Sequence, residues 1–113
     1  MVGKLSEATE IAVDLEHHNM RTYLGVTCLM QISTREEDWI VDTIALRKTL
    51  GDALRSVFDD PKIVKVLHGA DSDVEWLQRD FGLYLVNMFD TGQAARTVGH
   101  KQFGLAYLLQ HYC

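Results

Sequence analysis

The sequence predicts an α/β protein in which a mixed sheet carries helices on its faces. Three observations support this class. First, three short segments near the start of the chain have the alternating pattern of strands. Second, segments of helical period then alternate with short apolar runs. Third, the length of 113 residues and the composition (47% hydrophobic, 24% charged) suit one domain with one core. The order β-β-β-α-β-α-β-α-α predicts an antiparallel meander that continues into parallel strands through right-handed crossovers.

The meander is predicted from residues 10–16, 27–33 and 38–44, with loops at 19–25 and 34–37. In the first strand, every second residue is apolar, so Asp14 and Glu16 share the opposite face. Because the residues on that strand's other face are all apolar, we expect the strand to lie at the centre of the sheet.

The second half of the chain alternates helices and strands. Residues 46–58 have helical period and stop before Pro61, because a residue that precedes proline avoids the α region. Residues 63–67 and 83–89 are predicted strands. Between them a helix begins near Ser72, which forms the S-x-x-E pattern of a capping box with Glu75. Asp90 is predicted to cap a further helix, and residues 105–112 to form the last one.

Composition excludes several classes of protein. No run of eighteen apolar residues is present, and the first ten residues lack the apolar region of a secretory signal. Cys28 and Cys113 lie too far apart to make a disulfide framework and indicate a reducing compartment. The net charge of −5 argues against a general nucleic-acid surface, unless the acidic residues converge on bound cations.

Three carboxylates carry the candidate chemistry. Asp14 and Glu16 repel each other unless a cation lies between them, and Asp73 falls in the first turn of a predicted helix. Read singly, the first two could be solvated acids of an edge strand, and Asp71 and Asp73 could be helix caps. Together they can meet at one end of a sheet, where hard oxygen ligands suit Mg²⁺ or Mn²⁺ and two metals would clamp a phosphodiester.

Four segments resemble one family closely. They are DLEHH at residues 14–18, CLMQIST at 28–34, HGADSDVEWLQRDFGLYLVNMFDT at 68–91 and QAAR at 93–96. They are similar to the DEDD-type 3′→5′ exonucleases of the nuclear exosome and, more distantly, to ribonuclease D. The resemblance implies a ribonuclease H-like fold, metal ligation by Asp14, Glu16 and Asp73, and contact of His17 and Trp76 with the terminal nucleotide.

The same resemblance implies an exoribonuclease that uses Mg²⁺ or Mn²⁺ and acts on single-stranded RNA 3′ ends in the nucleus with the exosome core. From the lack of a long apolar run we expect no membrane partner. The family's third motif, a Tyr four residues before an Asp, has no match here, because no acidic residue follows Asp90. We therefore expect residues 1–113 to form an incomplete exonuclease domain with one metal ligand missing and with weak or no activity. We also expect an uncovered apolar sheet face that favours self-association.

Two other functions stay open at this point. One is a non-catalytic RNA-binding or scaffolding module that retains the exonuclease fold. The other is zinc binding through His17, His18, His68 and Cys28, although adjacent histidines on a strand point to opposite faces.

Overall fold

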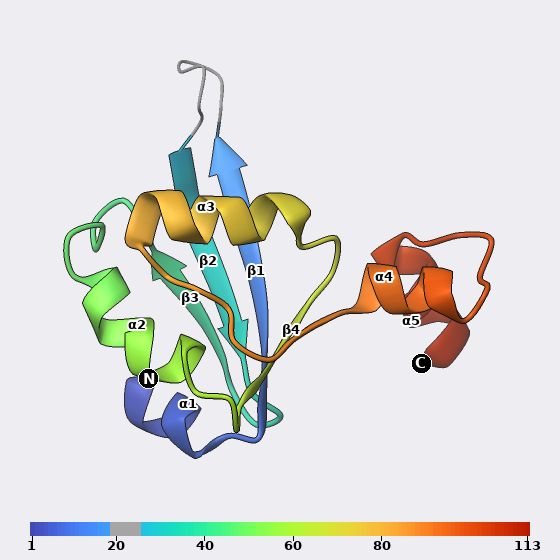
Figure 1. Cartoon of the computed structure of the whole chain (residues 1–113), viewed down its shortest axis with the longest axis horizontal. Helices are drawn as coiled ribbons and strands as arrows, with labels where there is room; N and C mark the ends of the chain where they lie inside the picture. Colours follow the sequence, from blue (N-terminus) through green and yellow to red (C-terminus); the bar gives the residue numbers. More distant parts are fainter. Residues whose placement is uncertain (19–25) are drawn as a thin grey trace.

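The computed structural model describes the backbone of residues 1–18 and 26–113 and the side chains of residues 1–16 and 29–113. In these ranges, five strands form one mixed sheet in the order β3-β2-β1-β4-β5 (Figure 1). β1 (Glu10–His18), β2 (Val26–Ser33) and β3 (Asp38–Asp42) form the antiparallel meander, and β4 (Val64–Leu67) and β5 (Met88–Asp90) run parallel to β1. The predicted fold class is therefore confirmed, whereas the predicted loop at 19–25 lies outside the described residues.

β1 lies at the centre of the sheet, between β2 and β4, as its sequence predicts. Ile11, Val13 and Leu15 are buried, and the residues between them face the other side of the sheet. On that side Asp14 pairs across the strands with Gln31, and Glu16 with Leu29. We call this side the open face, because α1, α2 and α3 cover the other one.

Three helices and one face of the sheet enclose the core. α1 (Val2–Glu7), α2 (Leu50–Phe58) and α3 (Asp71–Phe81) each contribute buried apolar residues to the cluster formed by the inward residues of β1 and β2. α4 (Thr91–Thr97) and α5 (Leu105–Tyr112) lie to one side of the sheet (Figure 1). Within the two described ranges, no helix is both long and apolar enough to cross a membrane.

Several predicted boundaries are wrong for local reasons. β3 ends at Asp42 because its carboxylate accepts hydrogen bonds from the backbone N–H groups of Ile44 and Ala45, which turns the chain away from the strand. Residues 43–49 consequently form turns, and α2 begins at Leu50 rather than at residue 46. The short helix α1 was not predicted from the sequence.

The predicted capping box of Ser72 and Glu75 is also wrong. α3 begins one residue earlier, at Asp71, and its N-cap residue Ala70 has no side-chain cap. At the other end of α3, Gly82 adopts a left-handed conformation (φ 64°), and Leu83 donates a backbone hydrogen bond to Leu77.

The left-handed Gly82 and the hydrogen bond from Leu83 to Leu77 make Leu83 part of the end of α3 rather than the start of a strand. Asn87 also has a positive φ of 63°, so β5 starts only at Met88 instead of at residue 83.

A buried lysine forms hydrogen bonds to the two chain segments that precede β4 and β5. Lys65 is fully buried, and its Nζ donates to the carbonyl oxygens of Asp60 (2.7 Å) and Val86 (2.8 Å). Burial lowers the pKa of Lys65, and the nearby carboxylates of Asp60 and Asp59 oppose that shift.

Candidate active site

The candidate site lies where β1 and β4 end and the chain enters α3. Ala12 is the last β1 residue that pairs with β4, opposite Val66, so Asp14 lies at the carboxyl end of this parallel pair. The chain leaves β4 at Leu67 and begins α3 at Asp71. The carboxyl ends of parallel strands are the usual ligand-binding edge of an α/β sheet.

Asp73 reaches this edge from α3 because it occupies a position on the buried stripe of the helix. Asp73, Leu77 and Phe81 follow one another at intervals of four residues, and all three are buried. Only 7% of Asp73 is exposed, although a carboxylate at such a position is unusual. An acid in the apolar stripe of an amphipathic helix was thus a sequence signal of function.

The surroundings of Asp73 disfavour its charged form. Burial raises its pKa to about 6, and the neighbouring carboxylates of Asp14 and Asp90 add to this effect. Asp14 and Asp73 come from segments far apart in the sequence, and the fold brings their charges close enough to repel. A bound cation would relieve both the repulsion and the cost of burial.

The donor set fits a hard divalent cation, because it consists of carboxylate oxygens. Asp14 and Glu16 are exposed on the same face of β1, and Asp73 approaches from α3. In the described ranges, no three or more His, Cys, Asp or Glu side chains are grouped closely enough to hold a metal ion. The structure therefore brings Asp14 and Asp73 together and leaves Glu16 farther along the same strand face.

Asp90 is a structural acid, as its predicted capping role implies. Its carboxylate accepts hydrogen bonds from the backbone N–H groups of Gly92 (2.8 Å) and Gln93 (3.2 Å) in α4. It also accepts from Gly69 (3.0 Å) and Ala70 (2.7 Å) before α3. Burial favours the neutral form of Asp90, but these four bonds outweigh it and lower its pKa.

A cavity of about 270 Å³ opens beside Asp14 on the open face, and its polar wall includes His68 and Thr91. His68 Nδ1 lies 2.8 Å from Thr91 Oγ1, and that hydroxyl donates its one proton to the carbonyl of Leu67 (3.2 Å). The hydroxyl of Thr91, the first residue of α4, thus lies between His68 and the carbonyl oxygen of Leu67, the last residue of β4. No pattern in the sequence predicts this chain of bonds.

The two residues predicted to contact the terminal nucleotide have different outcomes. Trp76 is half-buried and packs against the core cluster, from the helix that carries Asp73. The side chain of His17 lies outside the described side chains, as do those of His18 and Cys28 from the zinc hypothesis. The contact of His17 and Trp76 with a nucleotide consequently stays a prediction.

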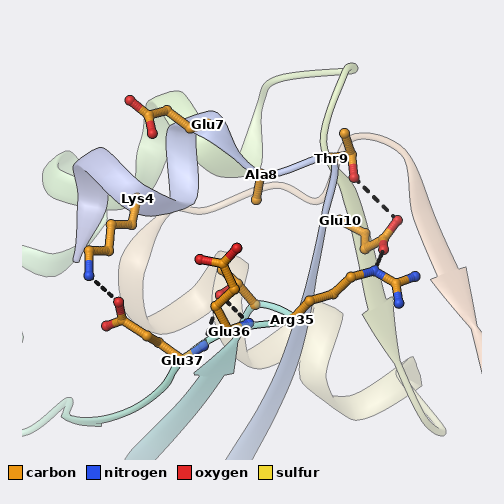
Figure 2. A pocket seen from close by; sticks show the side chains of 9 residues that line it. Lys4, Glu7, Ala8, Thr9, Glu10, Arg35, Glu36 and Glu37 are labelled. Atoms are coloured by element: carbon orange, nitrogen blue, oxygen red, sulfur yellow. Dashed lines mark hydrogen bonds and ion pairs between the residues drawn. The ribbon is translucent and has the colours of Figure 1, made fainter.

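A second cavity, of about 340 Å³, lies at the opposite end of β1 (Figure 2). Its cations already have acidic partners, since Lys4 pairs with Glu37, and Arg35 with Glu10. Figure 2 shows Glu7 and Glu36 lining the same cavity. An acidic cavity with its cations engaged does not suit a phosphate, so it is not a candidate site for nucleic acid.

Comparison with known proteins points to one family. A family model described as 3′-5′ exonuclease matches residues 1–113. The chain is 58% identical to Protein RRP6-like 2 of Arabidopsis thaliana over 113 residues, and 60% identical to human Exosome complex component 10 over 110 residues. These matches cover 100% and 97% of the chain but only 13% and 12% of the two relatives.

A solved structure agrees with this grouping. The chain superposes on the catalytic core of RRP6 from Trypanosoma brucei with a TM-score of 0.95 and 52% identity, over 99% of this chain and 31% of that one. The arrangement of the sheet and of α3 described above is therefore similar to that of an exonuclease core. The chain spans less than a third of the length of each of these three proteins.

Proposed function

Because the chain belongs to the 3′-5′ exonuclease family and is a homologue of RRP6 and Exosome complex component 10, we propose that it is a metal-dependent exonuclease domain that removes nucleotides from the 3′ ends of single-stranded RNA. The observation that carries the proposal is the approach of Asp14 to the buried carboxylate of Asp73. Burial raises the pKa of Asp73 to about 6, and the neighbouring charge of Asp14 adds to this effect.

Asp14, Glu16 and Asp73 would hold the divalent cations, Mg²⁺ or Mn²⁺. When bound, these ions supply Lewis-acid stabilisation of the scissile phosphate and of the leaving 3′ oxygen, and they lower the pKa of the attacking water. The protein's own contribution is to fix the carboxylates. Asp73 is held by its buried helix stripe, and Asp14 by its place on the central strand.

Contacts with the RNA end would come from residues beside these ligands. We propose that Trp76 and His17 border the terminal nucleotide, because Trp76 lies one turn after Asp73 on α3 and His17 follows Glu16 in β1. Hydrolysis of each terminal phosphodiester would release a nucleoside 5′-monophosphate. Two relatives are named as an exosome complex component and an exosome complex exonuclease, which supports the exosome core as the partner. We propose nuclear RNA as the substrate.

We expect slow turnover by the 113-residue chain. It offers three candidate carboxylates, whereas the family resemblance implies a fourth and a Tyr, and no acidic residue follows Asp90. Removal of one member of a catalytic set that acts as a unit costs several orders of magnitude in rate. For this reason we regard residues 1–113 as an incomplete exonuclease domain.

The test is an assay of single-stranded RNA labelled at the 5′ or the 3′ end, with Mg²⁺ or Mn²⁺ and prolonged incubation. We expect slow, ladder-like shortening from the 3′ end that EDTA stops and that Asp14→Ala and Asp73→Asn abolish. Asp71→Asn is the matched control, because Asp71 lies in the same helical turn but is exposed.

Equal products from wild type and Asp14→Ala, or no shortening by a folded protein, would overturn the exonuclease proposal. If that folded protein still retained RNA in a binding assay, the chain would instead be an RNA-binding module with the exonuclease fold.

A further inference from the structure

The segment that follows Asp90 differs in charge from the rest of the chain. All 16 acidic residues lie at or before Asp90, whereas Arg96 and Lys101 come after it. Among the described residues, the ion pairs engage Lys4, Arg35, Arg55 and Arg79, and neither Arg96 nor Lys101 takes part in one. These two cations therefore remain available to an anionic partner in a protein whose net charge is −5.

Four aromatic rings gather in the same segment of the chain, after Asp90. His100 packs edge-on against Tyr107, His111 and Tyr112, with ring centroids 5.8, 4.9 and 5.5 Å apart. His100 Nε2 and the hydroxyl of Tyr112 form a hydrogen bond of 2.6 Å, yet 66% of Tyr112 is exposed. The position of Tyr112 is thus fixed by His100, while most of its surface faces solvent.

Arg96 is oriented by a ring as well. Its guanidinium carbon lies 5.0 Å from the centroid of the Phe103 ring. A cation–π contact uses the flat face of a guanidinium and leaves the N–H groups at its edge free to donate to phosphate oxygens. Together, Arg96, Lys101 and the four rings of His100, Tyr107, His111 and Tyr112 form what we call the cationic–aromatic surface.

This surface belongs to the segment that borders the candidate site. Thr91, the first residue of α4, and Leu105, the first residue of α5, line the cavity that also contains Asp14. Figure 1 shows α4 and α5 beside the sheet rather than over it. A strand whose 3′ end reaches Asp14 could continue onto these helices.

We propose that the cationic–aromatic surface binds single-stranded RNA upstream of its 3′ end. Arg96 and Lys101 contact phosphates, and a base stacks on the exposed ring of Tyr112. Cations that follow a backbone, together with aromatic rings that stack on bases, are the usual elements of sequence-independent binding to single strands. That the ligand is RNA, with its 3′ end at Asp14, rests on the proposed function.

The test measures the affinity of the folded 113-residue chain for a single-stranded RNA in EDTA, as a function of salt concentration. Each phosphate contact with a single strand adds about 0.7 to the salt slope, so Arg96→Gln/Lys101→Gln should reduce the slope by about 1.4. The control Arg47→Gln/Lys48→Gln removes the same charge from an exposed turn between β3 and α2 and should leave the slope nearly unchanged.

Tyr112 is tested separately. Tyr112→Ala should weaken RNA binding roughly tenfold, and Tyr112→Phe, which keeps the ring but loses the bond to His100, should retain most of the affinity. An affinity that is equal in Tyr112→Ala and wild type, a slope that falls equally in both double variants, or no RNA binding at all would overturn the inference.

Because EDTA prevents metal-dependent hydrolysis, the binding measurement does not depend on the outcome of the exonuclease assay. If the chain shortens RNA but the salt slope does not change as predicted, RNA binding by the cationic–aromatic surface is refuted and the exonuclease proposal stands. If the slope changes as predicted but no RNA is shortened, the exonuclease proposal is refuted and RNA binding by this surface stands.

Discussion

Asp90 Oδ2 accepts a hydrogen bond of 2.7 Å from the backbone N–H of Ala70, and in this way the acid that caps α4 also holds the start of α3. The bond links residues twenty positions apart. It fixes the turn that delivers Asp73 to the site edge, so the position of this candidate ligand depends on a carboxylate that we do not expect to bind metal.

Replacement of Asp90 should therefore destabilise the fold. Asp90→Ala removes a helix cap and leaves the buried N–H of Ala70 without an acceptor, which should lower the free energy of unfolding by roughly 2–4 kcal/mol. Urea unfolding measures the change. Asp90→Asn should cost less, because its amide oxygen can still accept from the α4 amides; equal losses in the two variants would contradict this account.

The raised pKa of Asp73 makes stability depend on pH. Its pKa is about 6 in the folded protein against 3.8 for the free side chain, so the folded state binds more protons between these values. Stability from this group is therefore fully present below pH 4 and is lost as the pH rises through 6, by up to about 3 kcal/mol. Other carboxylates titrate in the same range, so the variant comparison isolates Asp73.

Asp73→Asn should accordingly be more stable than the metal-free wild type at pH 7.5, and the difference should shrink toward pH 4.5. Thermal unfolding in EDTA across this range measures it. A difference that is constant with pH would show that the charge of Asp73 is not the cause.

Gly51 allows α2 to approach the end of α3 closely. A Cβ atom at this position would lie 2.2 Å from the carbonyl oxygen of Phe81, which is backbone and cannot move aside easily. Gly51→Ala should lower stability by roughly 1–3 kcal/mol. Gly3→Ala is the control, because nothing lies within 4 Å of its Cβ and a helical alanine should stabilise α1 slightly. Stabilisation by both substitutions would contradict the packing described here.

The open face of the sheet should favour self-association. Leu29, Ile40 and Phe89 are 38%, 72% and 50% exposed, and the strand register places them on the face of Asp14 and Glu16. We expect sedimentation to show a mass that rises with concentration above 12.8 kDa. Ile40→Lys should restore the monomer and Tyr84→Lys, elsewhere on the surface, should not. A wild-type protein that stays monomeric as it is concentrated would rule this out.

The sequence allowed the sheet and much of the site to be predicted because both depend on local patterns. The alternation around Asp14 follows from a central strand with one covered face, and Asp90 is followed by the helix that it caps. Each is visible within a few residues. The missed features need tertiary structure: α1 is too short and lacks a side-chain cap, and the bond from Ala70 to Asp90 joins the two ends of the crossover through α3.

Burial explains why Asp73 could be placed but its pKa could not. The sequence positions it in the first turn of a helix, where the helix dipole favours its charge. Burial and the nearby charges of Asp14 and Asp90 have the opposite effect, and they outweigh the dipole, so the pKa of Asp73 is raised. The start of α3 was mispredicted for a related reason. Ser72 has the sequence pattern of a cap, but the N–H groups of Gly69 and Ala70 before the helix are bound by Asp90, which is distant in sequence.

The measurement that tests the central claim most directly is a titration of the chain with Mn²⁺, followed by paramagnetic broadening of backbone amide NMR signals. We expect the amide signals of Asp14, Glu16 and Asp73 to broaden first. Asp14→Asn and Asp73→Asn should each weaken Mn²⁺ binding at least about tenfold, because each removes a charged oxygen ligand, and Asp71→Asn should not. Broadening that begins around Glu7 and Glu36, or equal affinity in all four proteins, would contradict a metal site at the carboxyl end of β1.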